Sequence, residues 1–140
     1  MEKLCSCGNT VMVQLSTVIY HNLVTIEGVP IYACNECGSN EIHSAVKLDL
    51  KKLIEKHEQT EEKIIVHMEE FSEVSYFYKQ MLESADPDRS IPELIEERIN
   101  ELLDTYILAK SLSDQIWTDD IYKRLLQLNT LKSQYDTAVS

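Results

Sequence analysis

The amino-acid sequence predicts an α+β fold, in which a small antiparallel sheet at the N-terminus is followed by a helical region. All four cysteines of the 140-residue chain lie within its first 37 residues, in two closely spaced pairs. Between these pairs apolar side chains alternate with others, as in strands, and after residue 44 they recur every three or four residues, as in helices. We therefore expect two parts, residues 1–43 and residues 44–140.

The two cysteine pairs predict a structural zinc site with Cys5, Cys7, Cys34 and Cys37 as its ligands. Zinc prefers four soft ligands at the corners of a tetrahedron, and two short turns can supply them from opposite sides. A glycine follows each pair, which allows the chain to turn back and point backbone N–H groups at the thiolates. A closed four-thiolate site has no position for water, so we expect it to stabilise the fold without catalysing a reaction.

Two other uses of these cysteines stay open, a disulfide pair and an iron–sulfur cluster. A reducing cytosol disfavours the disulfide. The first pair has one intervening residue where two are usual, so it departs from the common zinc knuckle. His21 and His43 are alternative ligands, either of which could replace a cysteine.

Three short antiparallel strands, a zinc ribbon, are expected in the first part. The first is the alternating run of residues 11–19 and the second is the run of residues 23–26. Glu27 and Gly28 are expected to make a turn that leads into residues 29–33. So small a sheet buries little apolar surface, and we expect the metal to supply the missing stability.

The second part is expected to begin with one long amphipathic helix, which Ser44 caps and which continues without proline to Ala85. Its apolar stripe is wide enough for packing in a bundle. The residues of the stripe that recur every seven positions are Leu50, His57, Ile64, Phe71 and Tyr78.

A turn at residues 85–89 should separate this helix from a second one that starts at Ile91. Ser90 is the expected N-cap of the second helix, Pro92 lies in its first turn, and Glu93 completes a capping box.

The apolar pattern weakens around residues 112–120. Ser113 or Thr118 could cap a third helix there, or the second and third helices could be one bent helix. We therefore expect residues 44–140 to form a long-helix hairpin or a three-helix bundle.

Five aromatic residues are candidates for contact with a partner: Phe71, Tyr76, Phe77, Tyr78 and Trp117. The three consecutive ones cannot all face the interior of a helical protein, so at least one should be exposed or pack on a partner. Core packing is the alternative for two of them. The long apolar stripe also predicts a homodimer through the helices.

The chain has a formal net charge of −11, from 24 acidic and 13 basic residues. A field of this sign repels phosphate backbones, so we expect no direct nucleic-acid binding and a protein partner that is itself basic. No apolar run approaches the roughly 20 residues that cross a bilayer, and the N-terminus has no signal segment, so we expect a cytoplasmic protein and no membrane contact. The sequence has no phosphate-binding glycine loop and no nucleophile motif, so we do not expect an enzyme.

Residues 5–54 resemble the YgiT-type zinc finger, the N-terminal module of the MqsA-type antitoxins. The resemblance rests on the two cysteine pairs, the β-rich stretch of residues 10–26, the segment of residues 28–38, and the leucine-rich start of the helix that follows. It implies that the four cysteines hold zinc structurally and that the module contacts a toxin. The DNA-binding part of such antitoxins is a C-terminal helix-turn-helix, which this sequence lacks.

Together these observations predict a zinc-binding regulatory or adaptor protein that acts through protein–protein interaction. One alternative is a toxin-neutralising antitoxin without a DNA-binding domain. The other is an acidic nucleic-acid mimic that inhibits a basic protein.

Overall fold

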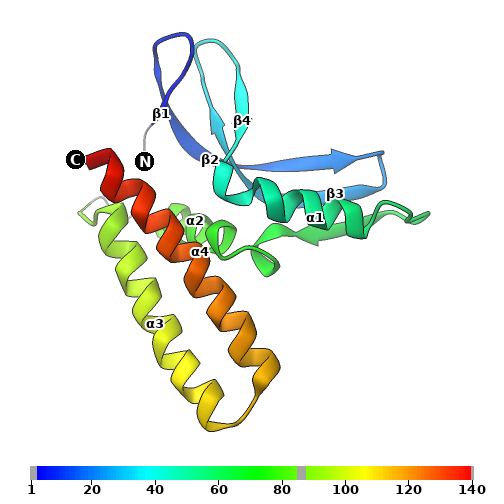
Figure 1. Cartoon of the computed structure of the whole chain (residues 1–140). Helices are drawn as coiled ribbons and strands as arrows, with labels where there is room; N and C mark the ends of the chain where they lie inside the picture. The colour runs from blue at the N-terminus through cyan, green and yellow to red at the C-terminus, as the bar shows by residue number, and fades with distance from the viewer. Residues whose placement is uncertain (1–2, 85–87, 140) are drawn as a thin grey trace. The chain divides into compact units, whose positions relative to one another are not determined.

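The structure of the protein is a computed structural model that describes residues 3–84 and 88–139 (Figure 1). The chain divides into two compact units, Met1–Leu82 and Glu83–Ser140. The first contains all the strands, and the second is built from helices. The predicted α+β class is confirmed, while residues 85–87 of the expected turn lie outside the described residues.

A five-stranded sheet organises the first unit, with β3 at its centre. Strand β3 pairs antiparallel with β2 along one edge, and along the other edge it pairs antiparallel with β4 and parallel with β5. Strand β1 extends the sheet by pairing with β2. The strands are β1 (Lys3–Leu4), β2 (Thr10–Tyr20), β3 (Val24–Ala33), β4 (Asn40–Ile42) and β5 (Ile64–His67).

The turn of the β2–β3 hairpin lies at His21 and Asn22, and the turn expected at Glu27 and Gly28 was wrong. His21 and Asn22 have φ angles of 51° and 58°, which a tight hairpin turn of the primed type requires. Gly28 also has a positive φ, of 78°, but it lies inside β3, opposite the shift in register near Ser16. Between the pairs Ser16–Val29 and Val18–Ile26, β3 has one residue more than β2. Because glycine tolerates a positive φ, this additional residue forms a β-bulge and the strand continues beyond it.

The single long helix expected up to residue 85 was also wrong, because a strand interrupts it. Helix α1 (Lys47–Lys56) ends at His57, and α2 (Glu73–Ser84) begins only after β5 and the short helix η2 (Met68–Glu70). The β-branched run before His67 pairs with β3, and this long-range pairing outweighs the seven-residue repeat. The compact unit with the cysteines therefore extends beyond residue 43.

The start of the helical region also differs from the expectation. Ser44 begins a short helix, η1 (Ser44–Val46), and the residue before it provides the cap. Ala45 N–H donates to Nδ1 of His43 at 3.1 Å. The imidazole therefore performs the capping role expected of Ser44.

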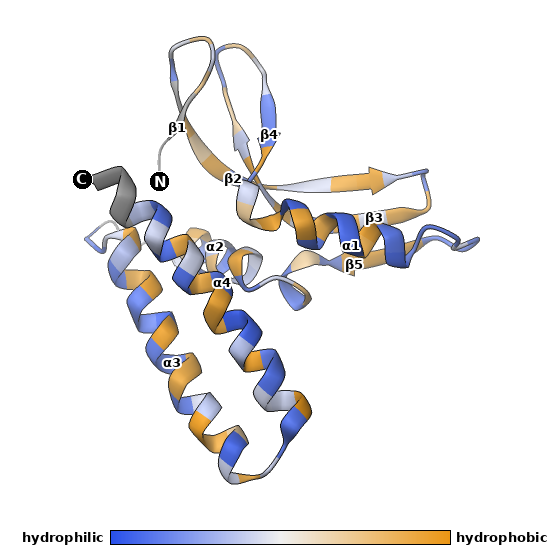
Figure 2. Ribbon diagram, viewed as in Figure 1, coloured by the Kyte–Doolittle hydropathy of each residue, from blue (hydrophilic) through white to orange (hydrophobic). Residues whose placement is uncertain are grey.

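The second unit is an antiparallel hairpin of α3 (Ile91–Ser111) and α4 (Gln115–Val139). Lys132 near the end of α4 pairs with Glu96 near the start of α3, at 2.7 Å. Apolar bands run along both helices (Figure 2). The predicted cap of α3 is confirmed, since the hydroxyl of Ser90 accepts from the N–H of Glu93 at 3.3 Å.

Two separate helices meet at the tip of this hairpin, and neither Ser113 nor Thr118 is the cap of α4. The carboxylate of Asp114 accepts from the N–H of Trp117 at 3.0 Å and takes that role. Ser113 instead lies two residues past the end of α3, with a left-handed φ of 56° that turns the chain toward α4.

Among the residues that the structure describes, no helix has both the length and the apolar character needed to cross a membrane.

Candidate metal centre

Two loops of the first unit carry the four cysteines, and each loop is a tight knuckle. The β1–β2 loop holds Cys5 and Cys7, and its turn is closed by the N–H of Gly8, which donates to the carbonyl of Cys5 at 2.9 Å. The N–H of Cys5 in turn donates to the carbonyl of Asn9 at 2.8 Å. Gly8 has a φ of 94°, a conformation that side chains disfavour, so glycine is suited to this point of the turn.

The β3–β4 loop repeats this arrangement around Cys34 and Cys37. The N–H of Gly38 donates to the carbonyl of Cys34 at 2.9 Å, and the N–H of Cys34 donates to the carbonyl of Ser39 at 2.9 Å. Gly38 has a φ of 74°. Both knuckles therefore turn back at a glycine, as the sequence predicts.

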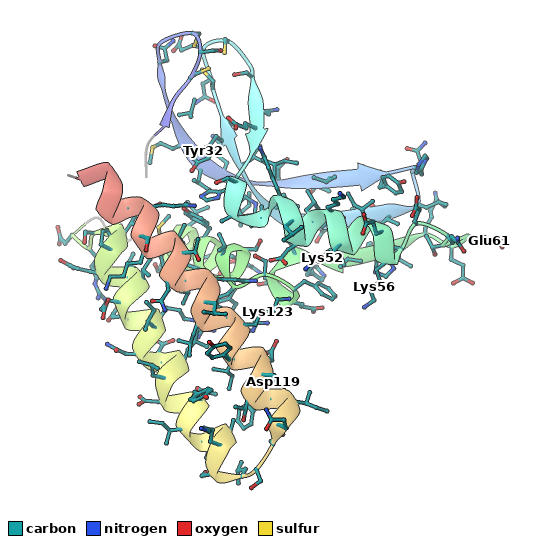
Figure 3. The ribbon with its side chains drawn as sticks, in the orientation of Figure 1. Tyr32, Lys52, Lys56, Glu61, Asp119 and Lys123 are labelled. Carbon is teal, nitrogen blue, oxygen red and sulfur yellow. The ribbon has the colours of Figure 1, made fainter. Side chains whose placement is uncertain are left out.

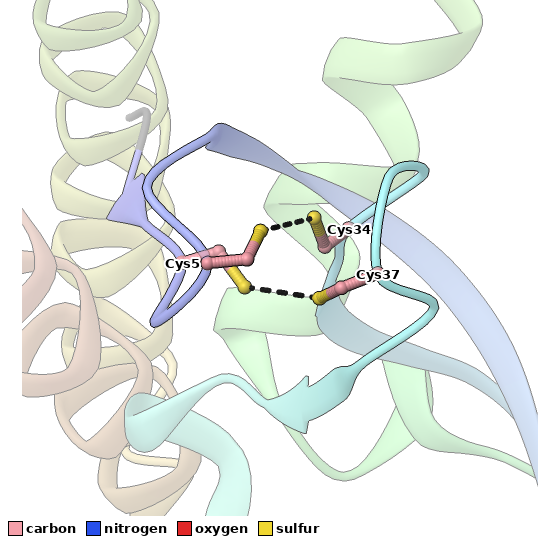
Figure 4. A group of neighbouring side chains, drawn as sticks. Cys5, Cys34 and Cys37 are labelled. Atoms are coloured by element: carbon pink, nitrogen blue, oxygen red, sulfur yellow. Dashed lines mark hydrogen bonds between the residues drawn. The ribbon is translucent and has the colours of Figure 1, made fainter.

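The two knuckles bring all four sulfur atoms together, within 4.8 Å of one another (Figure 4). The Sγ atoms of Cys5 and Cys37 are 3.4 Å apart, and those of Cys7 and Cys34 are 3.5 Å apart. A tetrahedron with metal–sulfur bonds of about 2.3 Å has edges of about 3.8 Å, within this range of separations. The donor set fits a metal ion that accepts four thiolates, and the tight first pair reaches the site as well as the second.

The surroundings of the sulfur atoms lower the pKa of Cys5 and Cys7 and raise the pKa of Cys34. The N–H of Cys7, the hydroxyl of Ser39 and the thiol of Cys37 lower the pKa of the Cys5 thiol to about 6. The backbone and side-chain amides of Asn9 lower the pKa of Cys7. The N–H of Cys37 acts in the same direction on Cys34, but burial and the neighbouring thiols outweigh it and raise the pKa of Cys34 to about 11.

Sequence reasoning missed two polar residues that contact the sulfur atoms. The hydroxyl of Ser39 lies 3.2 Å from Sγ of Cys5 and 3.1 Å from Sγ of Cys37, so it touches both knuckles. The side-chain amide of Asn9 donates to Sγ of Cys7 at 3.4 Å. Both residues directly follow a Cys-Gly dipeptide, and this shared position is the signal that could have identified them.

Neither of the two candidate histidines belongs to the cysteine cluster. His21 is exposed in the hairpin turn, at the opposite end of the β2–β3 ladder from Cys34. His43 is fully buried, and both its ring nitrogens contact other groups, Nδ1 the N–H of Ala45 and Nε2 the hydroxyl of Tyr78. The structure thus gathers the four cysteines without a histidine.

The five aromatic candidates for an interface lie in different environments. Phe77 and Tyr78 are buried in this chain, whereas Tyr76 and Trp117 are half-buried. Phe71 is exposed just before α2, with the ammonium group of Lys56 5.4 Å from the centre of its ring. The surface therefore offers Phe71 and parts of Tyr76 and Trp117 to a partner.

Comparisons with protein-family models, with curated proteins and with solved structures find nothing that matches this chain.

Proposed function

We propose that this chain is a zinc-binding regulatory or adaptor protein, in which a four-thiolate zinc ion stabilises the fold and contact with another protein carries the function. The observation that supports the proposal most strongly is the convergence of the four sulfur atoms. They come from loops separated by 27 to 32 residues, yet all lie within 4.8 Å of one another. A cluster of this kind is the donor set that zinc takes in closed structural sites.

The chemistry of the site favours a structural role for the metal. Four protein thiolates fill the tetrahedral coordination of zinc, so a substrate or an activated water would have no ligand position. Cys5, Cys7, Cys34 and Cys37 would hold the ion, while Ser39 and Asn9 would donate hydrogen bonds to the thiolates. Such outer donors offset the negative charge that four thiolates bring to one ion.

Binding of the metal would join the two knuckles, which lie side by side at one end of the β2–β3 hairpin, where Met12 pairs with Ala33. Strand β1 has two residues and β4 has three, so the ladder alone holds the loops weakly. An ion shared between the loops would close them, and its binding free energy would contribute directly to folding.

A protein partner fits the remaining features of the surface. The net charge of −11 disfavours nucleic acid and favours a partner with basic groups. Several large apolar side chains are also exposed, among them Ile65 and Ile116. The toxin-neutralising role implied by the family resemblance stays a prediction.

Metal analysis of the purified full chain tests the metal half of the proposal. We expect one zinc ion per chain in wild type and in Ser6→Ala, which changes an exposed side chain between two ligands, and loss of zinc in Cys34→Ser. A metal-free wild-type protein, or one that contains iron and absorbs visible light, would contradict the assignment.

Affinity capture from native cells tests the adaptor half. We expect a protein partner to be recovered with the wild-type chain and to be identified by mass spectrometry. Recovery of no protein above the level of an empty matrix would contradict the adaptor role while leaving the metal result unchanged.

A further inference from the structure

Large apolar side chains are exposed along one part of the α3–α4 hairpin. Leu103 is 43% exposed, Ile107 67%, Tyr122 53% and Leu126 50%. Single exposed apolar residues are ordinary on a protein surface, but a contiguous group indicates contact with another molecule. We call these four residues the apolar face.

The four residues lie on the same side of the hairpin. On α3, Leu103, Ile107 and Lys110 follow one another at spacings of four and three residues, which places them along one stripe of the helix. On α4, Tyr122 and Leu126 continue a stripe that starts at Asp119.

The two stripes are neighbours in space. Lys110, Asp119 and Tyr122 line one hollow of about 540 Å³ near the tip of the hairpin. Asp119 is labelled on α4 in Figure 3. Because residues of both stripes border this hollow, the stripes open onto the same side.

The residues of the two stripes also stand at matching heights along the hairpin. The ion pair between Glu96 and Lys132 fixes the antiparallel alignment of the helices. With this alignment, Leu103 lies level with Leu126, and Ile107 lies level with Tyr122, to within about one residue or 1.5 Å. Lys110 and Asp119 are level in the same way.

We propose that the apolar face binds a second copy of this chain and that the two hairpins form an antiparallel four-helix bundle. The proposed two-fold axis runs parallel to the hairpin, so α3 of each copy lies over α4 of the other. Leu103 and Ile107 then meet Leu126 and Tyr122 of the second copy. Helical hairpins that expose an apolar stripe are commonly covered in this way.

The charges at both ends of the apolar face fit a second copy in this orientation. Toward the tip, Lys110 would meet Asp119 of the second copy. At the other end, Glu96 would meet Lys132 of the second copy. Each charged residue therefore meets an opposite charge, and complementary charges of this kind select a register and an orientation.

The area of the face fits a weak dimer. The proposed contacts run from Glu96 to Lys110 on α3, a length of about 21 Å, and two helices side by side are about 20 Å wide. Two such faces would bury roughly 800 Å² in total, which is the size of a weak interface.

Light scattering on the zinc-loaded full chain tests the proposal with a matched pair of variants. We expect the wild type to have twice its monomer mass of 16.2 kDa. In Ile107→Glu the dissociation constant should rise by roughly a hundredfold, because each dimer would bury two unpaired carboxylates. Leu108→Glu is the control, since Leu108 is 50% exposed on a different side of α3 and should leave the dimer unchanged.

A charge-reversal pair tests the orientation of the two copies. Lys110→Asp would place two aspartates opposite each other in the homodimer, and Asp119→Lys would place two lysines opposite each other. Each variant alone should dimerise more weakly than wild type, whereas an equal mixture should form a heterodimer with opposite charges at both positions. Repulsion within each hairpin is the same in the separate and mixed samples, so recovery on mixing reports contact between copies.

A monomeric mass for the wild type at about 100 µM, well above the dissociation constant expected of a specific dimer, would overturn the proposal. A dimer that survives Ile107→Glu with its affinity unchanged would overturn the assigned face. Failure of the mixture to recover would overturn the orientation. Circular dichroism of each variant establishes that it is folded before its mass is interpreted.

Discussion

His43 and Tyr78 meet in the interior of the first unit, with Nε2 of the imidazole 3.2 Å from the phenol oxygen. Because the N–H of Ala45 donates to Nδ1, the ring proton of the neutral imidazole lies on Nε2, which donates to Tyr78. The contact joins the end of β4 to α2 across 35 residues of sequence.

Tyr32 extends this contact toward the cysteine cluster. Its ring stacks on His43, with 5.1 Å between the ring centres and an angle of 21°. Tyr32 lies on β3, two residues before Cys34 (Figure 3). Burial, and then the carboxylate of Glu41, raise the pKa of the Tyr32 phenol, so it is neutral around pH 7. The aromatic cluster thus connects the knuckles to α2.

Tyr78→Phe should destabilise the first unit by about 1–2 kcal/mol, because the buried imidazole loses a hydrogen-bond partner. Urea denaturation followed by circular dichroism measures this change in the free energy of unfolding. Tyr20→Phe is the control, since Tyr20 is only half-buried, and it should change the free energy much less. Equal effects of the two variants would contradict the importance of the contact.

Ser39→Ala should weaken zinc binding by about tenfold, because the hydroxyl of Ser39 contacts the sulfur atoms of both Cys5 and Cys37. Competition with a chromophoric chelator measures the affinity. Ser6→Ala removes a hydroxyl from the first knuckle without removing a ligand and should bind zinc as the wild type does. An unchanged affinity in Ser39→Ala would show that its hydroxyl does not support the metal.

In the metal-free protein, Cys5 should react with iodoacetamide at a much lower pH than Cys34. The lowered pKa of Cys5, about 6, means that its thiolate is already present at neutral pH. The pKa of Cys34, about 11, keeps this thiol protonated until the pH is strongly alkaline. Mass spectrometry of peptides labelled across a pH series measures both profiles, and coincident profiles would contradict this order.

Ser113→Gly should stabilise the α3–α4 hairpin by about 0.5–1 kcal/mol, because glycine adopts a left-handed φ without the steric cost of a side chain. Around Ser113 the N–H of Asp114 donates to the carbonyl of Ala109 at 3.1 Å, and that of Ser113 to the carbonyl of Lys110 at 3.0 Å. These bonds form a Schellman motif, in which glycine is the preferred residue. Thermal denaturation measures the change, and Ser111→Gly, inside the helix, should lower stability instead.

Local features that depend on a few neighbouring residues were predictable from the sequence alone. Both knuckles turn at the glycine that follows a cysteine pair. The turn depends only on the φ angle of that glycine and on hydrogen bonds within the same loop. Ser90 caps α3 because its hydroxyl reaches the N–H of Glu93 within one turn of helix. The same reasoning named Ser113 and Thr118 as possible caps of α4 but not Asp114, although all three residue types cap helices well.

The cysteine cluster could be predicted because its chemistry restricts the answer. Two short pairs of thiols can be arranged in few ways that use every sulfur atom as a ligand or in a disulfide. The structure brings all four sulfur atoms within 4.8 Å of one another. Ser39 and Asn9 could not be predicted with the same certainty, because a serine or an asparagine after a glycine is also ordinary turn chemistry.

The sequence by itself determined the order of the sheet and the helices, the set of cysteines that come together, and the start of α3 at the Ser90 cap. Only the tertiary structure decided that Ile64–His67 is a strand and that His43 is a buried partner of Tyr78. The seven-residue repeat through Ile64 fits a helix, whereas the β-branched side chains of residues 64–66 fit a strand, and the pairing with β3 decides between them. Contacts between distant residues outweigh local preference there because pairing satisfies the backbone groups of β5 and covers part of the apolar surface on β3.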